Sequence, residues 1–119
     1  MGMNIADAIH KIEAEGVKIQ YHQRQLITDK PVASEEVRKY LCTHLQSVRA
    51  AADFIESVYR AEWESKTGAY SIYETLLDRI AIIELTMKGL GIDNSQINEL
   101  IDIAFENVKK FERMNRSEK

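Results

Sequence analysis

Apolar residues recur at helical spacing near the start of the chain. Between residues 5 and 12 they return every three or four positions, as expected for a helix with one buried face. Asn4 followed by Asp7 is a helix-start signal, because side-chain oxygens can accept from the free N–H groups of the first turn. We therefore expect a helix from about Ile5 to Glu15, ended by Gly16 in a left-handed conformation.

Residues 17–28 fit two different periods. In one, apolar or aromatic side chains at positions 17, 19 and 21 alternate with polar ones as in a half-buried strand, and a second strand spans about Gln25 to Thr28. In the other, a heptad continues the first helix, which places Gly16 and Gln23 at core positions. We favour the hairpin, with a turn near residues 22–24 that lacks the usual Gly or Asn. The helix stays open as the alternative.

A long helix is expected after Pro31, which removes a backbone donor and interrupts helical geometry. Ser34 can cap the new helix, and no Gly or Pro interrupts the sequence before Gly68. The pattern predicts one helix from Glu35 to about Lys66, roughly 48 Å long at 1.5 Å per residue. Its apolar positions are Val37, Leu41, Leu45, Val48, Ala52, Ile55 and Tyr59.

Two further helices are predicted in the second half of the chain. Ser71 and Glu74 form a capping box, and the apolar spacing from there continues to Leu90, with Gly89 and Gly91 as the stop. A capping pair at residues 93 and 96 starts the last helix, which runs to about residue 114.

These elements predict a mainly α fold, an antiparallel helical bundle with one long central helix and a small N-terminal β-hairpin. With 119 residues, 45% of them hydrophobic, the chain can bury about two-thirds of its surface as one compact domain. Residues 3–50 form its helix, hairpin and helix segment, and residues 51–119 continue the bundle. The expected core comprises Leu41, Leu45, Val48, Ile55, Leu76, Ile80, Ile83, Ile101 and Val108.

The order of elements in the first 45 or so residues resembles the N-terminal docking domain named after TubC. The resemblance covers the stretches Ala6–Ile19, Gln25–Thr28 and Ser34–Val37, the last leading to Leu41 and Leu45. It implies a homodimer and a hairpin that binds the C-terminal tail of a partner subunit by strand addition, in which backbone hydrogen bonds give affinity.

For this chain, the resemblance implies a non-catalytic protein–protein interaction module that dimerises and accepts an extended peptide or partner subunit. Lys18, His22 and Arg24 are then the charged residues that meet an acidic tail, and Leu26 and Thr28 line the second strand. The alternative is that these five are ordinary surface side chains. The predicted long helix outreaches the two helices after it, so we expect it to pack against the N-terminal segment or a second chain.

A small ribonuclease is the alternative function. Arg38 and His44 are separated by five residues, which is similar to the Arg-x(4–6)-His signature of HEPN-type ribonucleases. His44 would act as general acid or base, and Arg38 would stabilise the developing negative charge.

The sequence gives no support for a metal site, a cofactor site, nucleic-acid binding or a membrane span. We expect no metal and no cofactor, because the three histidines and Cys42 lack the spacing of a ligand set. A net charge of −3 does not favour nucleic acid as a partner, and no apolar run approaches membrane-spanning length. A single cysteine allows no disulfide within the chain, so we expect a cytoplasmic protein.

Overall fold

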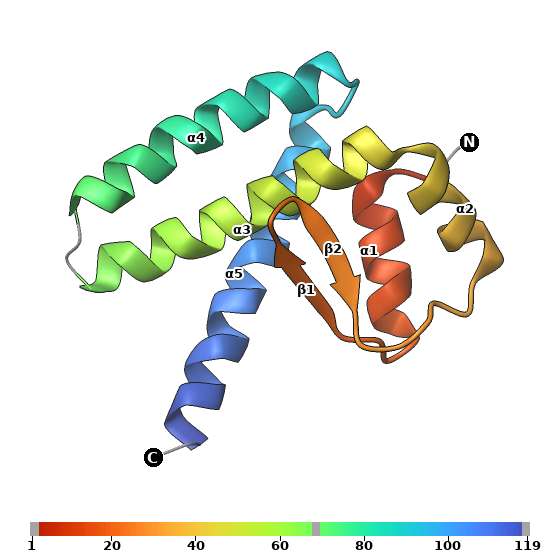
Figure 1. Ribbon diagram of the computed structural model, residues 1–119, viewed down its shortest axis with the longest axis horizontal. Helices are drawn as coiled ribbons and strands as arrows, with labels where there is room; N and C mark the ends of the chain where they lie inside the picture. Colours follow the sequence, from red (N-terminus) through yellow and green to blue (C-terminus); the bar gives the residue numbers. More distant parts are fainter. Residues whose placement is uncertain (1–2, 68–69, 118–119) are drawn as a thin grey trace.

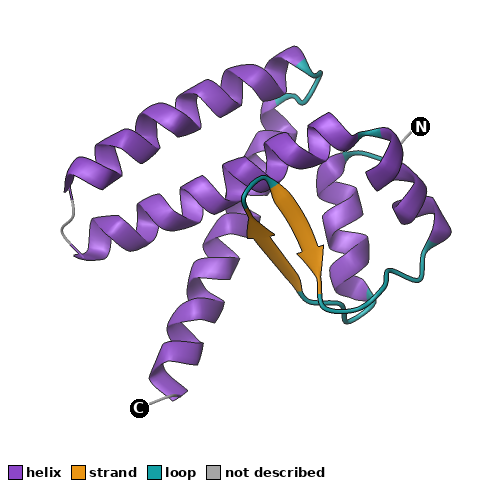
Figure 2. Cartoon of the chain, in the orientation of Figure 1, coloured by secondary structure: helices purple, strands orange, loops and turns teal. Residues whose placement is uncertain are grey.

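The structure is a computed structural model that describes residues 3–67 and 70–117, with side chains described for residues 3–66 and 73–106. It is mainly α, with a long central helix against which other elements pack, and a two-stranded antiparallel sheet near the N-terminus (Figures 1 and 2). The predicted fold class is therefore confirmed. The elements of the described chain are α1 (Ile5–Ala14), β1 (Ile19–His22), β2 (Gln25–Thr28), α2 (Glu35–Thr43), α3 (Leu45–Thr67), α4 (Tyr70–Gly89) and α5 (Asn94–Ser117).

The ends of α1 agree with the sequence prediction. The side chain of Asn4 accepts from the backbone N–H of Asp7 at 2.8 Å, and the Asp7 carboxylate accepts from the N–H of Asn4 at 3.4 Å. Gly16 has a φ of +80°, the left-handed conformation that lets the chain leave the helix. The carboxylate of Glu15 also accepts the N–H groups of Ala33 and Ser34, so the end of α1 holds the start of α2.

The segment after α1 forms a hairpin, and the alternative of a continued helix is wrong. Strand β1 pairs with β2 in antiparallel register, with Ile19 opposite Thr28 and His22 opposite Gln25. Alternation of apolar and polar residues therefore decided the local structure, although the turn lacks Gly and Asn.

The prediction of one helix from residue 35 to residue 66 is wrong, because the chain breaks at His44 into α2 and α3. His44 has φ −116° and ψ 44°, outside the helical region. The hydroxyl of Thr43 donates to the carbonyl of Lys39 at 2.9 Å, and the His44 ring stacks on Tyr40 with centroids 4.3 Å apart. Such side-chain bonds to the backbone compete with helix continuation. The bend lets α2 bury Val37 against α1.

The expected core is largely confirmed, with one correction. Val48, Ile55, Leu76 and Ile83 are buried, whereas Leu41, Ile80 and Ile101 are half-buried. Leu45 was expected in the core, but its side chain is 47% exposed, because it follows the bend and begins α3 on an outward side. Val108 lies outside the described side chains.

Helices α3 and α4 form an antiparallel pair, and α5 crosses α3 (Figure 1). The connection from α4 to α5 follows the predicted stop, because Gly91 has a φ of +86° and the N–H of Ile92 donates to Met87 at 2.9 Å. Asp93 then caps α5 by accepting from the N–H of Gln96 at 3.0 Å. α4 begins at Tyr70, and the side chain of the predicted cap Ser71 lies outside the described part.

An ion pair joins α3 to α4. The guanidinium of Arg79 donates to one carboxylate oxygen of Asp53, from Nη2 at 2.8 Å and from Nε at 3.2 Å. Asp53 is 9% exposed and would be costly to bury without this partner. The pair therefore satisfies a charge in the interface between the two helices.

Within residues 3–67 and 70–117, none of the helices combines the length and the apolar character that a membrane crossing needs.

Phe54 is 0% exposed at the centre of α3, whereas Phe105 on α5 is 42% exposed. We expect Phe54→Ala to lower the free energy of unfolding by about 3–5 kcal/mol, because a cavity replaces a buried ring. Phe105→Ala is the matched control and should cost less than about 1 kcal/mol. Urea denaturation measures both, and equal losses would contradict this core.

Candidate functional site

The hairpin has one face toward the helices and one toward solvent. Ile19 and Tyr21 on β1, with Leu26 and Thr28 on β2, are half-buried, whereas the alternate residues of both strands are exposed. Ile19, Tyr21 and Leu26 pack against the hydrophobic core. The sheet is thus anchored by its inner face.

The outward backbone groups at both edges of the hairpin lack hydrogen-bond partners among the described residues. The N–H of Asp29 donates to the carbonyl of Lys18 at 3.1 Å, which marks these residues as a hydrogen-bonded pair. Hydrogen-bonded pairs alternate along an antiparallel ladder, so the pairs 20–27 and 22–25 are bonded as well. The N–H and C=O groups that point outward, without a hydrogen-bond partner in the described chain, belong to Ile19, Tyr21, Leu26 and Thr28.

The two edges differ in their surroundings. In Figure 1 the hairpin is drawn over α3, with α1 on the side of β2 and α5 on the side of β1. The base of the hairpin is closed by Asp29, whose carboxylate accepts the N–H of Lys18 at 2.9 Å. Neither edge is paired with a further strand in the described chain.

The turn between the strands is under backbone strain. Gln23 and Arg24 have φ values of 50° and 64°, the left-handed region required at both central residues of a type I′ turn. This region suits Asn and Gly, whereas larger side chains adopt it at a cost of about 1–2 kcal/mol each. The turn places Arg24 at the exposed tip of the hairpin.

The predicted partner-binding residues divide into two groups. Lys18, His22 and Arg24 are exposed, as an interaction with a charged partner requires. Leu26 and Thr28 are half-buried on the inner face, so β2 offers their backbone groups at its edge while their side chains face the protein. The His22 ring lies 3.1 Å, Nδ1 to Oε2, from the Glu56 carboxylate on α3, a contact that the sequence did not predict.

The inner face of the hairpin also holds a perturbed phenol. Burial raises the pKa of Tyr21 far above its ordinary value, and the negative charge of Glu13 raises it further. The raised pKa favours the neutral phenol, and Tyr21 packs against the hydrophobic core under the sheet.

The residues of the alternative nuclease site are both exposed but are not joined by a hydrogen bond or an ion pair in the described chain. Arg38 lies on α2, and His44 follows the end of that helix. Nδ1 of His44 is 3.0 Å from the Thr43 hydroxyl, and its ring stacks on Tyr40. The ribonuclease assignment stays a prediction.

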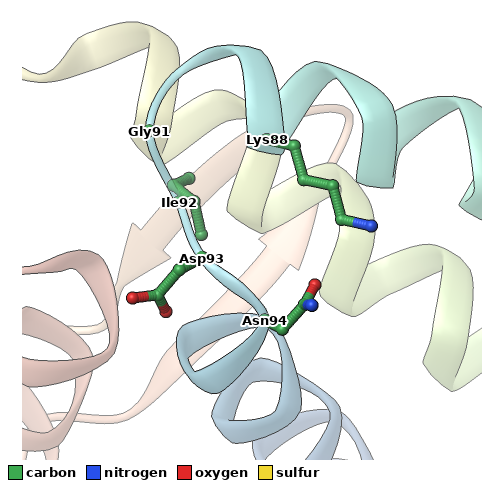
Figure 3. A pocket seen from close by; sticks show the side chains of 5 residues that line it. All are labelled: Lys88, Gly91, Ile92, Asp93 and Asn94. Carbon is green, nitrogen blue, oxygen red and sulfur yellow. The ribbon is translucent and has the colours of Figure 1, made fainter.

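The rest of the described chain offers little for catalysis. No group of three His, Cys, Asp or Glu residues that could hold a metal ion occurs among the described residues. An open hollow lies where α4 joins α5, lined by Lys88, Gly91, Ile92, Asp93 and Asn94 (Figure 3). The side chains of Lys88 and Asp93 point to opposite sides of it, and Asp93 is occupied in capping α5. The hollow therefore lacks converging reactive groups.

Comparison with known protein families, with curated proteins and with solved structures finds no match to this chain.

We expect the double substitution Gln23→Asn with Arg24→Gly to raise the free energy of unfolding by about 0.5–1 kcal/mol, because these residues relieve the strain of a type I′ turn. Thermal or urea unfolding measures the change. Gly16→Ala is the opposite control, since its φ of +80° makes a side chain there costly by about 1 kcal/mol. A loss of stability in the double variant would contradict the turn geometry.

Proposed function

We propose that this protein is a non-catalytic interaction module whose hairpin accepts an extended peptide from a partner protein. The peptide adds a third strand at the outer edge of β1. Main-chain hydrogen bonds to Ile19 and Tyr21 supply affinity, and alternate side chains of the peptide supply selectivity.

The unpaired edge of β1 is the observation that carries the proposal. Its outward N–H and C=O groups have no partner in the described chain, and the inner face of the hairpin packs against the core. An exposed strand edge is a template for pairing with another chain. Anchoring by the core keeps this template in place, so that little ordering is left for the moment of binding.

Charge favours an acidic peptide. Lys18 is exposed just before β1 and Arg24 is exposed at the turn, and neither has an ion-pair partner in the described chain. His22, on the exposed face of the same strand, is held by Glu56. Acidic side chains on the solvent face of an added strand would therefore meet uncompensated positive charge at both ends of β1.

Self-association and a cytoplasmic location complete the proposal. A homodimer would present two hairpins to one partner assembly and strengthen binding through the second contact. The only cysteine, Cys42, is exposed, which fits a reducing compartment such as the cytoplasm.

Amide hydrogen exchange tests the docking edge. We expect acidic peptides with alternating apolar residues to slow exchange at Ile19 and Tyr21, because their N–H groups gain acceptors. Gln20 and His22 serve as internal controls, since their N–H groups are already bonded to β2. Protection confined to Leu26 and Thr28, or no protection by any acidic peptide, would contradict docking at β1.

Charge reversal gives a second readout of the same site. We expect Lys18→Glu and Arg24→Glu to weaken peptide affinity about three- to tenfold each at low salt, because partly exposed charge pairs contribute modestly. Lys30→Glu, an exposed residue in the loop after β2, is the matched control and should leave the affinity unchanged. Equal effects at all three positions would indicate only general electrostatic attraction.

A further inference from the structure

Helix α4 is apolar on two opposite sides. One side packs against α3 and buries Leu76, Ile83 and Met87. On the outward side, Ile82 is 65% exposed and Leu85 is 70% exposed. A helix with apolar residues on both sides is typical of one that is buried on both sides.

No other element covers the outward side of α4 in the part of the chain that the structure describes. Figure 1 shows α4 at the margin of the molecule, with α3 on its inner side and no element beyond it.

The outward side also carries uncompensated charge of opposite sign at its two ends. Glu74 and Asp78 lie toward the start of α4, and Lys88 lies near its end. All three are exposed and have no ion-pair partner in the described chain. A helix with this distribution is complementary to a second copy of itself that runs in the opposite direction.

One antiparallel register satisfies both the charges and the shapes. If the two copies cross at residue 83, Lys88 of each copy lies level with Asp78 of the other. In the same register, Leu85 meets Ala81 and Leu77 meets Gly89, so that each large side chain faces a small residue. Ala81 and Gly89 are both exposed. Small residues opposite large ones allow close packing of helices.

We propose that the outward face of α4 (Leu77, Ala81, Ile82, Leu85 and Gly89) binds the same face of a second copy of this chain, in a two-fold antiparallel pairing centred on residue 83. This interface is isologous, since each residue contacts its counterpart in both directions. The inference rests on the self-association part of the proposed function and assigns it a surface separate from the hairpin.

Light scattering and sedimentation at several protein concentrations test the surface. We expect a dimer for the unaltered chain and a rise in the dimer dissociation constant of roughly tenfold to a hundredfold for Leu85→Lys. Because Leu85 is exposed, the variant should keep the helical circular dichroism of the parent. The matched control is Ile27→Lys, another exposed apolar residue, which lies on β2 and should leave the dimer intact.

Charge exchange tests the register. Asp78→Lys and Lys88→Asp should each weaken the dimer about three- to tenfold, because each places like charges level with one another. The double variant should restore association, since the pair is then reversed. Restoration would not follow if the two residues merely stabilised α4 within one chain.

The outcomes separate this proposal from peptide docking. A monomeric parent chain overturns the proposal together with the self-association on which it rests. A dimer that Leu85→Lys leaves intact overturns the α4 assignment alone, and one that only Ile27→Lys dissociates moves the interface to the hairpin. Loss of the dimer in Leu85→Lys, with hairpin protection by peptides unchanged, supports two independent surfaces.

Discussion

The burial of the middle of α3 is the interaction on which the rest of the structure depends. The six consecutive residues from Ala50 to Ile55 are all buried, so this part of the helix is covered on every side. The N-terminal hairpin, α4 and α5 all pack against α3. Three of the six residues are alanines, which let neighbouring elements approach the helix closely, while Phe54 fills the space between them. Each surface element is thus positioned through its contact with one helix.

The hairpin is stabilised by its packing against the core around α3. A two-stranded sheet is marginally stable by itself, and its edges attract other strands. Here the inner side chains of the hairpin join the core around α3, and Glu15 ties the turn after α1 to the beginning of α2. The sheet can therefore keep open edges and a strained turn, since its stability comes mainly from the face that does not take part in the proposed docking.

Local signals in the sequence were sufficient for most of the elements and for most of their ends. Asn4, Gly16 and Gly91 act within a few residues of their own position, so their roles follow from the sequence alone. The break at His44 does not, because it depends on where α2 must go to bury Val37 against α1. The exposure of Lys18 followed from alternation and that of Arg24 from its place in the predicted turn. The contact of His22 with Glu56, by contrast, joins residues 34 apart in the chain. The second apolar side of α4, with Ile82 and Leu85, is also visible in the sequence, because both residues lie outside the stripe that predicted the helix. The prediction of a bundle used only the first stripe.

The ion pair between Asp53 and Arg79 also bears on how α4 is oriented against α3, because α4 is apolar on two sides. A helix that is apolar on opposite sides could in principle pack against α3 through either side. Only one rotation brings Arg79 to Asp53, and the other would leave a buried carboxylate without its cation. The contact between Asp53 and Arg79 thus favours the rotational setting in which Ile82 and Leu85 face outward.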